Sequence, residues 1–248
     1  MQTALVTYAV RLADDALIYG QRVSEWCSNA PTLEEDLALV NVTLDYIGRA
    51  RMFYEYASSY SGLSEDTYAF TRDGRDFTNL LICELPNGDF ANTLVRQYLL
   101  DEYEALFLGV LSSSSDDTLA LIAQKSLKET TYHLRRSHEW VLRLGMGTDE
   151  SHARACTALD ALWGYTPEIF AMDDIESGLA AENIAPDRLA LLGPWRENVA
   201  RTLQSAGLPV PADSWQVEGG RRGIHTEHLG HLLAEMQVMQ RSYPGLQW

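Results

Sequence analysis

The chain has 248 residues, 46% of them hydrophobic and 22% charged, which is typical of a folded globular protein and excludes a disordered one. Its formal net charge of −16 argues against nucleic-acid binding, because an acidic surface repels phosphate groups. The sequence has no apolar run of about 18 residues and no basic start ahead of an apolar stretch, so we expect neither a membrane span nor a signal peptide.

Two helices joined by a short turn are predicted at the start of the chain. Apolar and aromatic residues recur at steps of three and four, which predicts a helix of about six turns over about residues 5–26. Thr32 and Glu35 have capping-box spacing and begin a second predicted helix over about residues 33–58. The short connection predicts an antiparallel hairpin. The predicted inner face of the second helix carries Leu37, Asn41, Leu44 or Asp45, Gly48 and Met52.

A second pair of long helices is predicted in the middle of the chain. Turn signals dominate residues 59–89, a long crossover in which residues 77–84 are predicted to form a short helix. The third and fourth long helices are predicted over about residues 90–111 and 117–144, with Gly145 as the C-terminal stop of the fourth.

Shorter helices are predicted after residue 148. One is capped by Thr148, and others cover about residues 174–182, 186–206 with a break at Pro194, and 226–242. No convincing strand pattern is present. The sequence therefore predicts an all-α fold, a ferritin-like four-helix bundle with a long crossover and additional C-terminal helices. We expect a single domain over residues 1–248, with the core bundle at about 3–145 and accessory helices at about 148–248.

Bundles of this kind often hold two irons through a Glu from each of two helices and a Glu-x-x-His from each of the other two. In this chain the only Asp or Glu followed by His three residues later is Asp149, with His152, and both lie after the bundle. Gly48 and Tyr132 stand where two of the histidines would be needed. The predicted inner faces carry a different set, Asp15, Asp45, Asp101, Glu129 and His133.

Two interpretations of this acidic set remain open. In one, the five residues bind a metal and the chain is an oxidase in its own right. In the other, they form a degenerate acidic core without metal, because buried carboxylates are stable only when they are paired. The cations available on the same helices are Arg49, Arg51, Arg96 and Lys125. We favour the second interpretation and predict no metal, cofactor or catalytic residue in this chain.

The tail contains a second group of polar residues. His225, His228 and His231 are spaced three apart and follow the sequence GGRRG. They are compatible with a zinc site, or with a docked segment whose side chains contact the backbone or a partner. Arg221 and Arg222 are candidate contacts for a partner or for a phosphate, as in a coenzyme A docking module. The three cysteines have no metal-ligand spacing, which favours reduced thiols in the cytoplasm.

The sequence also resembles a known family. The segment FTNLLICELPNGDFANT and the tail GGRRGIHTEHLGHLLAEMQVMQRSYPGLQW are similar to the C subunit of the bacterial ring-1,2-phenylacetyl-CoA epoxidase, and the similarity extends over the whole chain. The resemblance implies a ferritin-like structural subunit of a cytoplasmic, multicomponent monooxygenase. It also implies three features of the complex: a homologous catalytic subunit with a di-iron centre, a reductase that delivers electrons from NADPH, and a role in aerobic phenylacetate catabolism.

Overall fold

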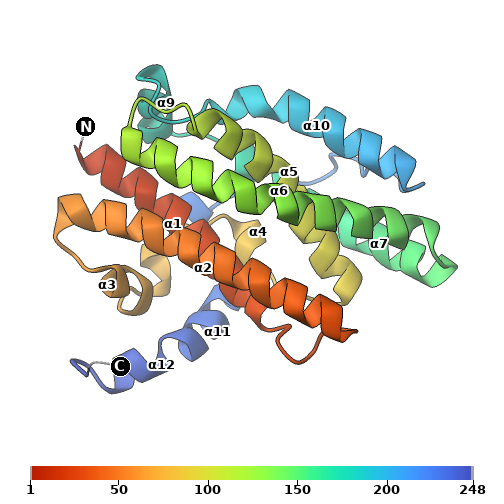
Figure 1. Cartoon of the computed structure of the whole chain (residues 1–248), viewed down its shortest axis with the longest axis horizontal. Helices are drawn as coiled ribbons and strands as arrows, with labels where there is room; N and C mark the ends of the chain where they lie inside the picture. Colours follow the sequence, from red (N-terminus) through yellow and green to blue (C-terminus); the bar gives the residue numbers. More distant parts are fainter. Residues whose placement is uncertain (1, 247–248) are drawn as a thin grey trace. The chain divides into compact units, whose positions relative to one another are not determined.

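The computed structural model describes residues 2–246, and these residues form helices, turns and loops without any strand (Figure 1). The predicted all-α class is confirmed. Contacts divide the chain into two compact units, residues 1–86 with 218–248 and residues 87–217, and each is described separately below. The single-domain assignment stays a prediction. No helix within residues 2–246 is long and apolar enough to cross a bilayer.

The first unit is built on a helical hairpin. Helices α1 (Gln2–Ser24) and α2 (Leu33–Ser61) pack side by side along their length (Figure 1). The hydroxyl of Thr32 accepts the backbone N–H of Glu35 at 3.4 Å and caps α2 as predicted. Gly62 ends α2 in the left-handed region, with φ of 75°. The predicted hairpin is therefore confirmed.

The predicted inner face of α2 is wrong. Leu37 and Leu44 are 57% and 63% exposed, and Asn41 is exposed as well. The helix packs instead through a different set of residues, which includes Leu39, Val42, Tyr46, Arg49 and Phe53. Leucine and valine residues occur on two opposite sides of the first three turns of α2, so their spacing alone does not show which side is buried. The larger aromatic residues further along decide which face is buried, because they bury the most area.

The crossover contains α3 (Glu65–Phe70), the 3₁₀ turn η1 (Gly74–Asp76) and α4 (Leu81–Glu84). Only the last turn of the helix predicted over residues 77–84 forms. The preceding residues are not helical because carboxylates of α1 bind their backbone N–H groups. Thr78 N donates to Asp14 at 2.8 Å and Leu80 N donates to Asp15 at 2.7 Å.

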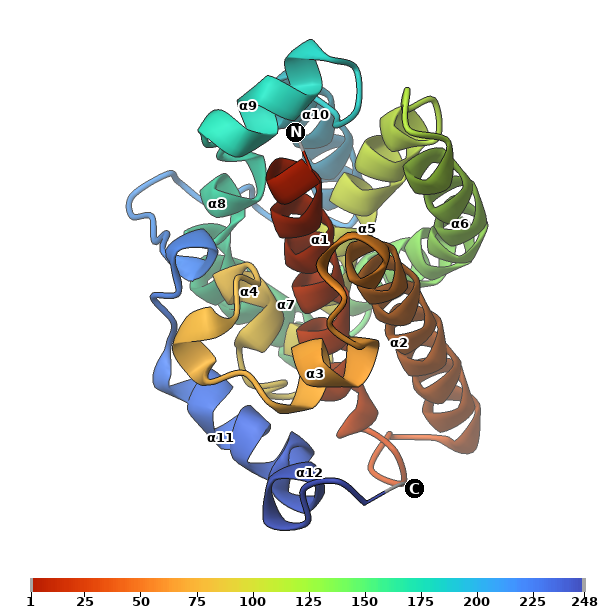
Figure 2. The same cartoon turned by 90° about the vertical axis from the view of Figure 1, so that its left-hand side faces the viewer.

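The C-terminal segment returns to the first unit as η2 (Gly220–Arg222), α11 (Glu227–Met236) and α12 (Val238–Ser242). Figure 2 shows α11 beside α4. The single helix predicted over residues 226–242 is divided at Gln237. The buried side-chain amide of Gln237 donates to Ala69 O and Arg72 O, both at 3.1 Å, and these contacts fix the break.

The second unit is built on a hairpin of α5 (Phe90–Leu111) and α6 (Asp117–Met146), capped by the side chains of Asp89 and Asp116. Helix α6 continues through Gly145, so the prediction that Gly145 stops it is wrong. A Cβ atom at Gly145 would lie 2.3 Å from Ala206 O. Glycine is needed there for the close approach of another backbone, rather than for a helix end.

Four shorter helices complete the second unit: α7 (Asp149–Trp163), α8 (Thr166–Phe170), α9 (Asp174–Ala181) and α10 (Arg188–Ser205). Thr148 caps α7 as predicted. Helix α8 was not predicted, and the predicted break at Pro194 is wrong because α10 continues through it. Proline removes one helical hydrogen bond, but burial of Trp195, Val199 and Leu203 just beyond it holds the helix in place.

Candidate functional site

The most extensive polar arrangement in the first unit surrounds two adjacent acids of α1. Asp14 is fully buried and accepts hydrogen bonds from Tyr54 Oη at 2.6 Å, Thr78 N at 2.8 Å and Thr78 Oγ1 at 2.9 Å. The guanidinium of Arg72 donates to both of its carboxylate oxygens. Burial, together with the Asp14 charge, raises the pKa of Tyr54 well above its usual value, so this hydroxyl stays protonated and donates.

Asp15 binds the C-terminal segment. Its two oxygens accept Nη1 and Nη2 of Arg221 at 2.9 and 2.6 Å, a bidentate pair, and Oδ1 also accepts Leu80 N at 2.7 Å. Arg221 Nη1 donates in addition to Thr78 O at 2.6 Å. The two predicted site residues Asp15 and Arg221 are thus brought together, in a partly buried ion pair that joins α1, the crossover and η2.

Glu84, at the end of α4, is the third acid of this arrangement and is fully buried, like Asp14. It accepts Thr226 N and Thr226 Oγ1 at 2.6 and 2.8 Å, Asn79 Nδ2 at 2.8 Å and His225 Nδ1 at 2.7 Å. Nε2 of His225 lies 2.8 Å from the carbonyl oxygen of Phe77. A carbonyl and a carboxylate both accept, so both ring nitrogens carry protons and His225 is an imidazolium.

Burial and the neighbouring groups shift the pKa of His225 in opposite directions. Burial lowers its pKa, but the hydrogen bond and the charge of Glu84, the Phe77 carbonyl and the more distant Asp14 together raise it above the usual value. Nearby, Arg22 donates to Glu84 O at 2.9 Å and to His228 O at 2.8 Å. We call this network the C-terminal clamp; its members are Asp14, Asp15, Arg22, Arg72, Glu84, Arg221 and His225.

The glycines of GGRRG let the clamp close. A Cβ atom at Gly220 would lie 2.0 Å from Asn79 O. Gly223 has φ of +70°, and a Cβ atom there would lie 2.2 Å from Arg75 O. The segment therefore packs backbone against backbone on the crossover, which no residue with a side chain allows. The interpretation of the tail as a docked segment agrees with this geometry.

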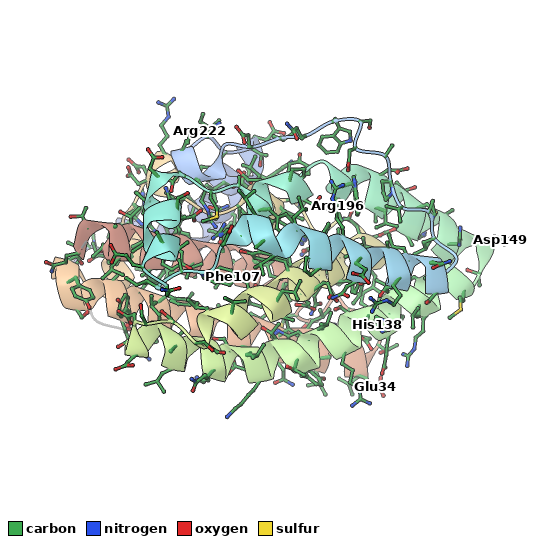
Figure 3. All side chains as sticks on the ribbon, turned by 90° about the horizontal axis from the view of Figure 1, so that it is seen from above. Glu34, Phe107, His138, Asp149, Arg196 and Arg222 are labelled. Atoms are coloured by element: carbon green, nitrogen blue, oxygen red, sulfur yellow. The ribbon has the colours of Figure 1, made fainter. Side chains whose placement is uncertain are left out.

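Four tail residues were candidate partner or phosphate contacts, and the structure places them differently. Arg221 and His225 belong to the clamp, while His228 contributes its carbonyl to Arg22. The side chain of Arg222 is 60% exposed, lies 3.3 Å from Glu218 and points away from the ribbon (Figure 3). It borders an open pocket of about 720 Å³ whose charged lining mixes Asp73, Asp76, Arg75 and Arg222.

The residues of the predicted acidic core lie on helices of both units. In the second unit, Asp101 is fully buried and accepts Ser137 Oγ at 2.7 Å, and His133 is fully buried on α6. Glu129, with its side chain 22% exposed, lies 4.0 Å from Lys125. In the first unit, Asp45 is half-buried on α2. Among residues 2–246, no three His, Cys, Asp or Glu side chains are grouped closely enough to hold a metal ion, the tail histidines included.

The four cations predicted to pair with these acids contact several kinds of group. Lys125 pairs with Glu129, but Arg51 pairs with Glu55 and Glu65 on the exposed side of α2. Arg49 lies over the ring of Tyr46, 4.7 Å from its centroid, and Arg96 donates to Asn87 Oδ1 at 2.5 Å. The pairing of Arg72 with Asp14 and of Arg221 with Asp15 was not predicted.

Comparison with known proteins identifies the family. A family model described as phenylacetic acid catabolic protein matches residues 1–248. The chain belongs to this family. It is also 47% identical over 245 residues to the C subunit of the 1,2-phenylacetyl-CoA epoxidase of Escherichia coli strain K12, an alignment that covers 98% of this chain and 99% of that relative.

The predicted family and its place in phenylacetate catabolism are therefore confirmed. The phenylacetic acid catabolic family is ferritin-like, so the predicted fold class is confirmed as well. The two long hairpins, α1 with α2 and α5 with α6, are the helices on which such a fold is built. In this member of the family, the clamp attaches the C-terminal segment to the first hairpin.

Proposed function

We propose that this chain is the structural, non-catalytic subunit of a phenylacetyl-CoA epoxidase, a cytoplasmic multicomponent monooxygenase of phenylacetate catabolism. In this proposal, a homologous catalytic subunit holds the di-iron centre and epoxidises the aromatic ring, and a reductase delivers electrons from NADPH. The similarity to the C subunit of the E. coli enzyme over nearly all of both chains supports the assignment as a subunit of such a complex.

The proposed non-catalytic role rests mainly on the groups that bind the carboxylate of Asp15. Both of its carboxylate oxygens bind the guanidinium of Arg221, and one also binds a backbone N–H group. A guanidinium there neutralises the acid in the way a metal ion would, but offers no open coordination position. The residues present at this position therefore do not fit a metal ligand set.

The acids of the second unit support the same conclusion. Asp101 accepts a serine hydroxyl, and Glu129 lies beside a lysine. Tyr132, three residues after Glu129, is 53% exposed, so the position that a Glu-x-x-His ligand pair requires faces outward. These contacts disfavour the alternative of a metal-binding oxidase. The alternative of a coenzyme A docking module loses Arg221 as a phosphate contact, since Asp15 binds it.

Reconstitution of the epoxidase tests the proposal. The remaining subunits are purified without this chain and assayed with phenylacetyl-CoA, NADPH and oxygen. We expect product formation only after this chain is added back. The variant Glu129→Gln should restore turnover to within about twofold of the unmodified chain, because a supporting subunit has no catalytic carboxylate. Full turnover without the chain, or its loss in the Glu129→Gln complex, would overturn the proposal.

A further inference from the structure

One face of α2 is apolar and exposed. Leu33, Leu37 and Leu44 are 71%, 57% and 63% exposed. They are four and seven residues apart, so they lie on the same side of the helix within its first three turns. Single exposed leucines are normal on a protein surface, but three on one helix face form a patch. We call these three residues the leucine face.

The leucine face has no role in the hairpin. Helix α2 packs on α1 through its opposite side, where Leu39, Val42 and Tyr46 are fully buried. Gly48 continues the leucine face, and a Cβ atom there would meet no atom within 4 Å. A helix that is apolar on both sides is normally covered on both sides. The N-terminal half of α2 thus has one side covered by the fold and one side open.

Charge decides what can cover this side. Two acids in the first turn of α2, Glu34 and Asp36, lie at the two edges of the leucine face, about 80° to either side of it. Figure 3 shows Glu34 at this end of the helix, where it is exposed. A second copy of the chain would bring the same acids and a further formal charge of −16 to the contact. A partner with an apolar surface bordered by Lys and Arg fits the leucine face better.

We infer that the leucine face is the docking surface for the catalytic subunit of the epoxidase, through a complementary apolar groove with a basic rim. This inference rests on the proposed function, and it names the part of the chain that makes the contact. Aliphatic anchors at the centre of the contact exclude water, and the acids at its edge set orientation and association rate.

The test measures binding of the full chain to the purified catalytic subunit. In the double variant Leu37→Asp/Leu44→Asp, charges enter the centre of the contact, and we expect the dissociation constant to rise about 100-fold or more. The matched control is Leu189→Asp on α10, where the leucine is 61% exposed. This control should bind within about threefold of the unmodified chain.

A second variant distinguishes weaker binding from misfolding. Leu33 lies in the first turn of α2, where an acid favours the helix. Leu33→Asp should therefore keep the helical circular dichroism signal and still weaken binding about tenfold. Glu34→Lys should weaken binding mainly at low salt, because it removes charge at the rim.

The outcomes separate the inference from the proposed function. If the unmodified chain and the leucine variants bind the catalytic subunit equally well, the inference is wrong and the proposed function stands. If the unmodified chain does not bind the catalytic subunit, both are wrong. If the unmodified chain forms a homodimer that Leu37→Asp/Leu44→Asp dissociates, the leucine face joins two copies and the inference is overturned.

Discussion

The C-terminal clamp and the leucine face lie in the same unit and use opposite chemistry. In the clamp, Asp14 and Glu84 are fully buried, and each binds a cation and several neutral donors. The leucine face consists of three uncharged, apolar side chains that are exposed to solvent. The clamp is complete within one chain, and the leucine face is not. Residue type alone therefore does not distinguish buried from exposed positions in a subunit of a larger assembly.

The clamp also shows how other parts of the chain neutralise the acids of the first unit. Each buried carboxylate receives donors from a segment distant in sequence, and Asp15 is 206 residues from Arg221. Such a network holds the tail against the crossover and α1. Its contribution to stability comes mostly from the cost of breaking it, because a buried charge without its partner is strongly unfavourable.

The largest effect is expected from removing a cation of the clamp. Arg72→Met leaves Asp14 buried beside an apolar side chain of similar length, and we expect a loss of about 3–5 kcal/mol in the free energy of unfolding. Urea denaturation followed by circular dichroism measures it. The matched control is Arg51→Met, because Arg51 pairs with Glu55 and Glu65 in the open. An equal loss in both variants would mean that burial of the pair is not what matters.

Replacing a glycine by alanine should have opposite effects on stability in the clamp and on the exposed side of α2. Gly220→Ala places a Cβ atom against Asn79 O and should cost about 1–3 kcal/mol. Gly48→Ala adds the same atom where nothing lies within 4 Å, and should stabilise α2 by about 0.5–1 kcal/mol. Thermal unfolding of the two variants beside the unmodified chain gives both values. A neutral Gly220→Ala would show that the tail does not pack closely on the crossover.

The pH dependence of stability should report on the His225–Glu84 pair. The pKa of His225 is raised in the folded chain by the Glu84 hydrogen bond and charge, although burial opposes this. Its stabilising effect is fully present below the usual value of 6.5 and is lost as the pH rises through the raised pKa. In His225→Gln this component is absent, so in urea titrations the stability difference between the two proteins should shrink as the pH rises from below 6.5 through the raised pKa. A difference that grows with pH would contradict the imidazolium.

The smallest effect is expected from the leucine face in the isolated chain. Leu44→Ser changes a side chain that is 63% exposed, so the free energy of unfolding should change by no more than about 0.5 kcal/mol. Differential scanning calorimetry of the isolated chain measures it. A loss of several kcal/mol would mean that this leucine belongs to the core of the chain and not to a docking surface.

Helix positions were predictable because their signals are local. The side chains of Thr32 and Thr148 cap helices within three residues of themselves, and sequence spacing reveals such caps. The predictions failed where a group distant in sequence determines the local backbone conformation. Residues 77–80 stay extended because Asp14 and Asp15, about 65 residues earlier, bind their backbone.

The candidate site was predictable only in part. Asp15 and Arg221 were both selected from the sequence, but nothing local indicated that they bind each other. Asp14 and Glu84 were missed, although Asp14 is next to Asp15 and lies among apolar residues of α1. The inner face of α2 was misassigned because leucine on a docking surface follows the same helical period as leucine in a core.

Metal content of the isolated chain beside that of its complex is the most direct test of a supporting role. The chain is purified alone and with the catalytic subunit after growth in iron-supplemented medium, and iron is measured by mass spectrometry. We expect almost no iron in the isolated chain and about two irons per catalytic subunit in the complex. Stoichiometric iron in the isolated chain that is lost in Glu129→Ala would contradict the supporting role.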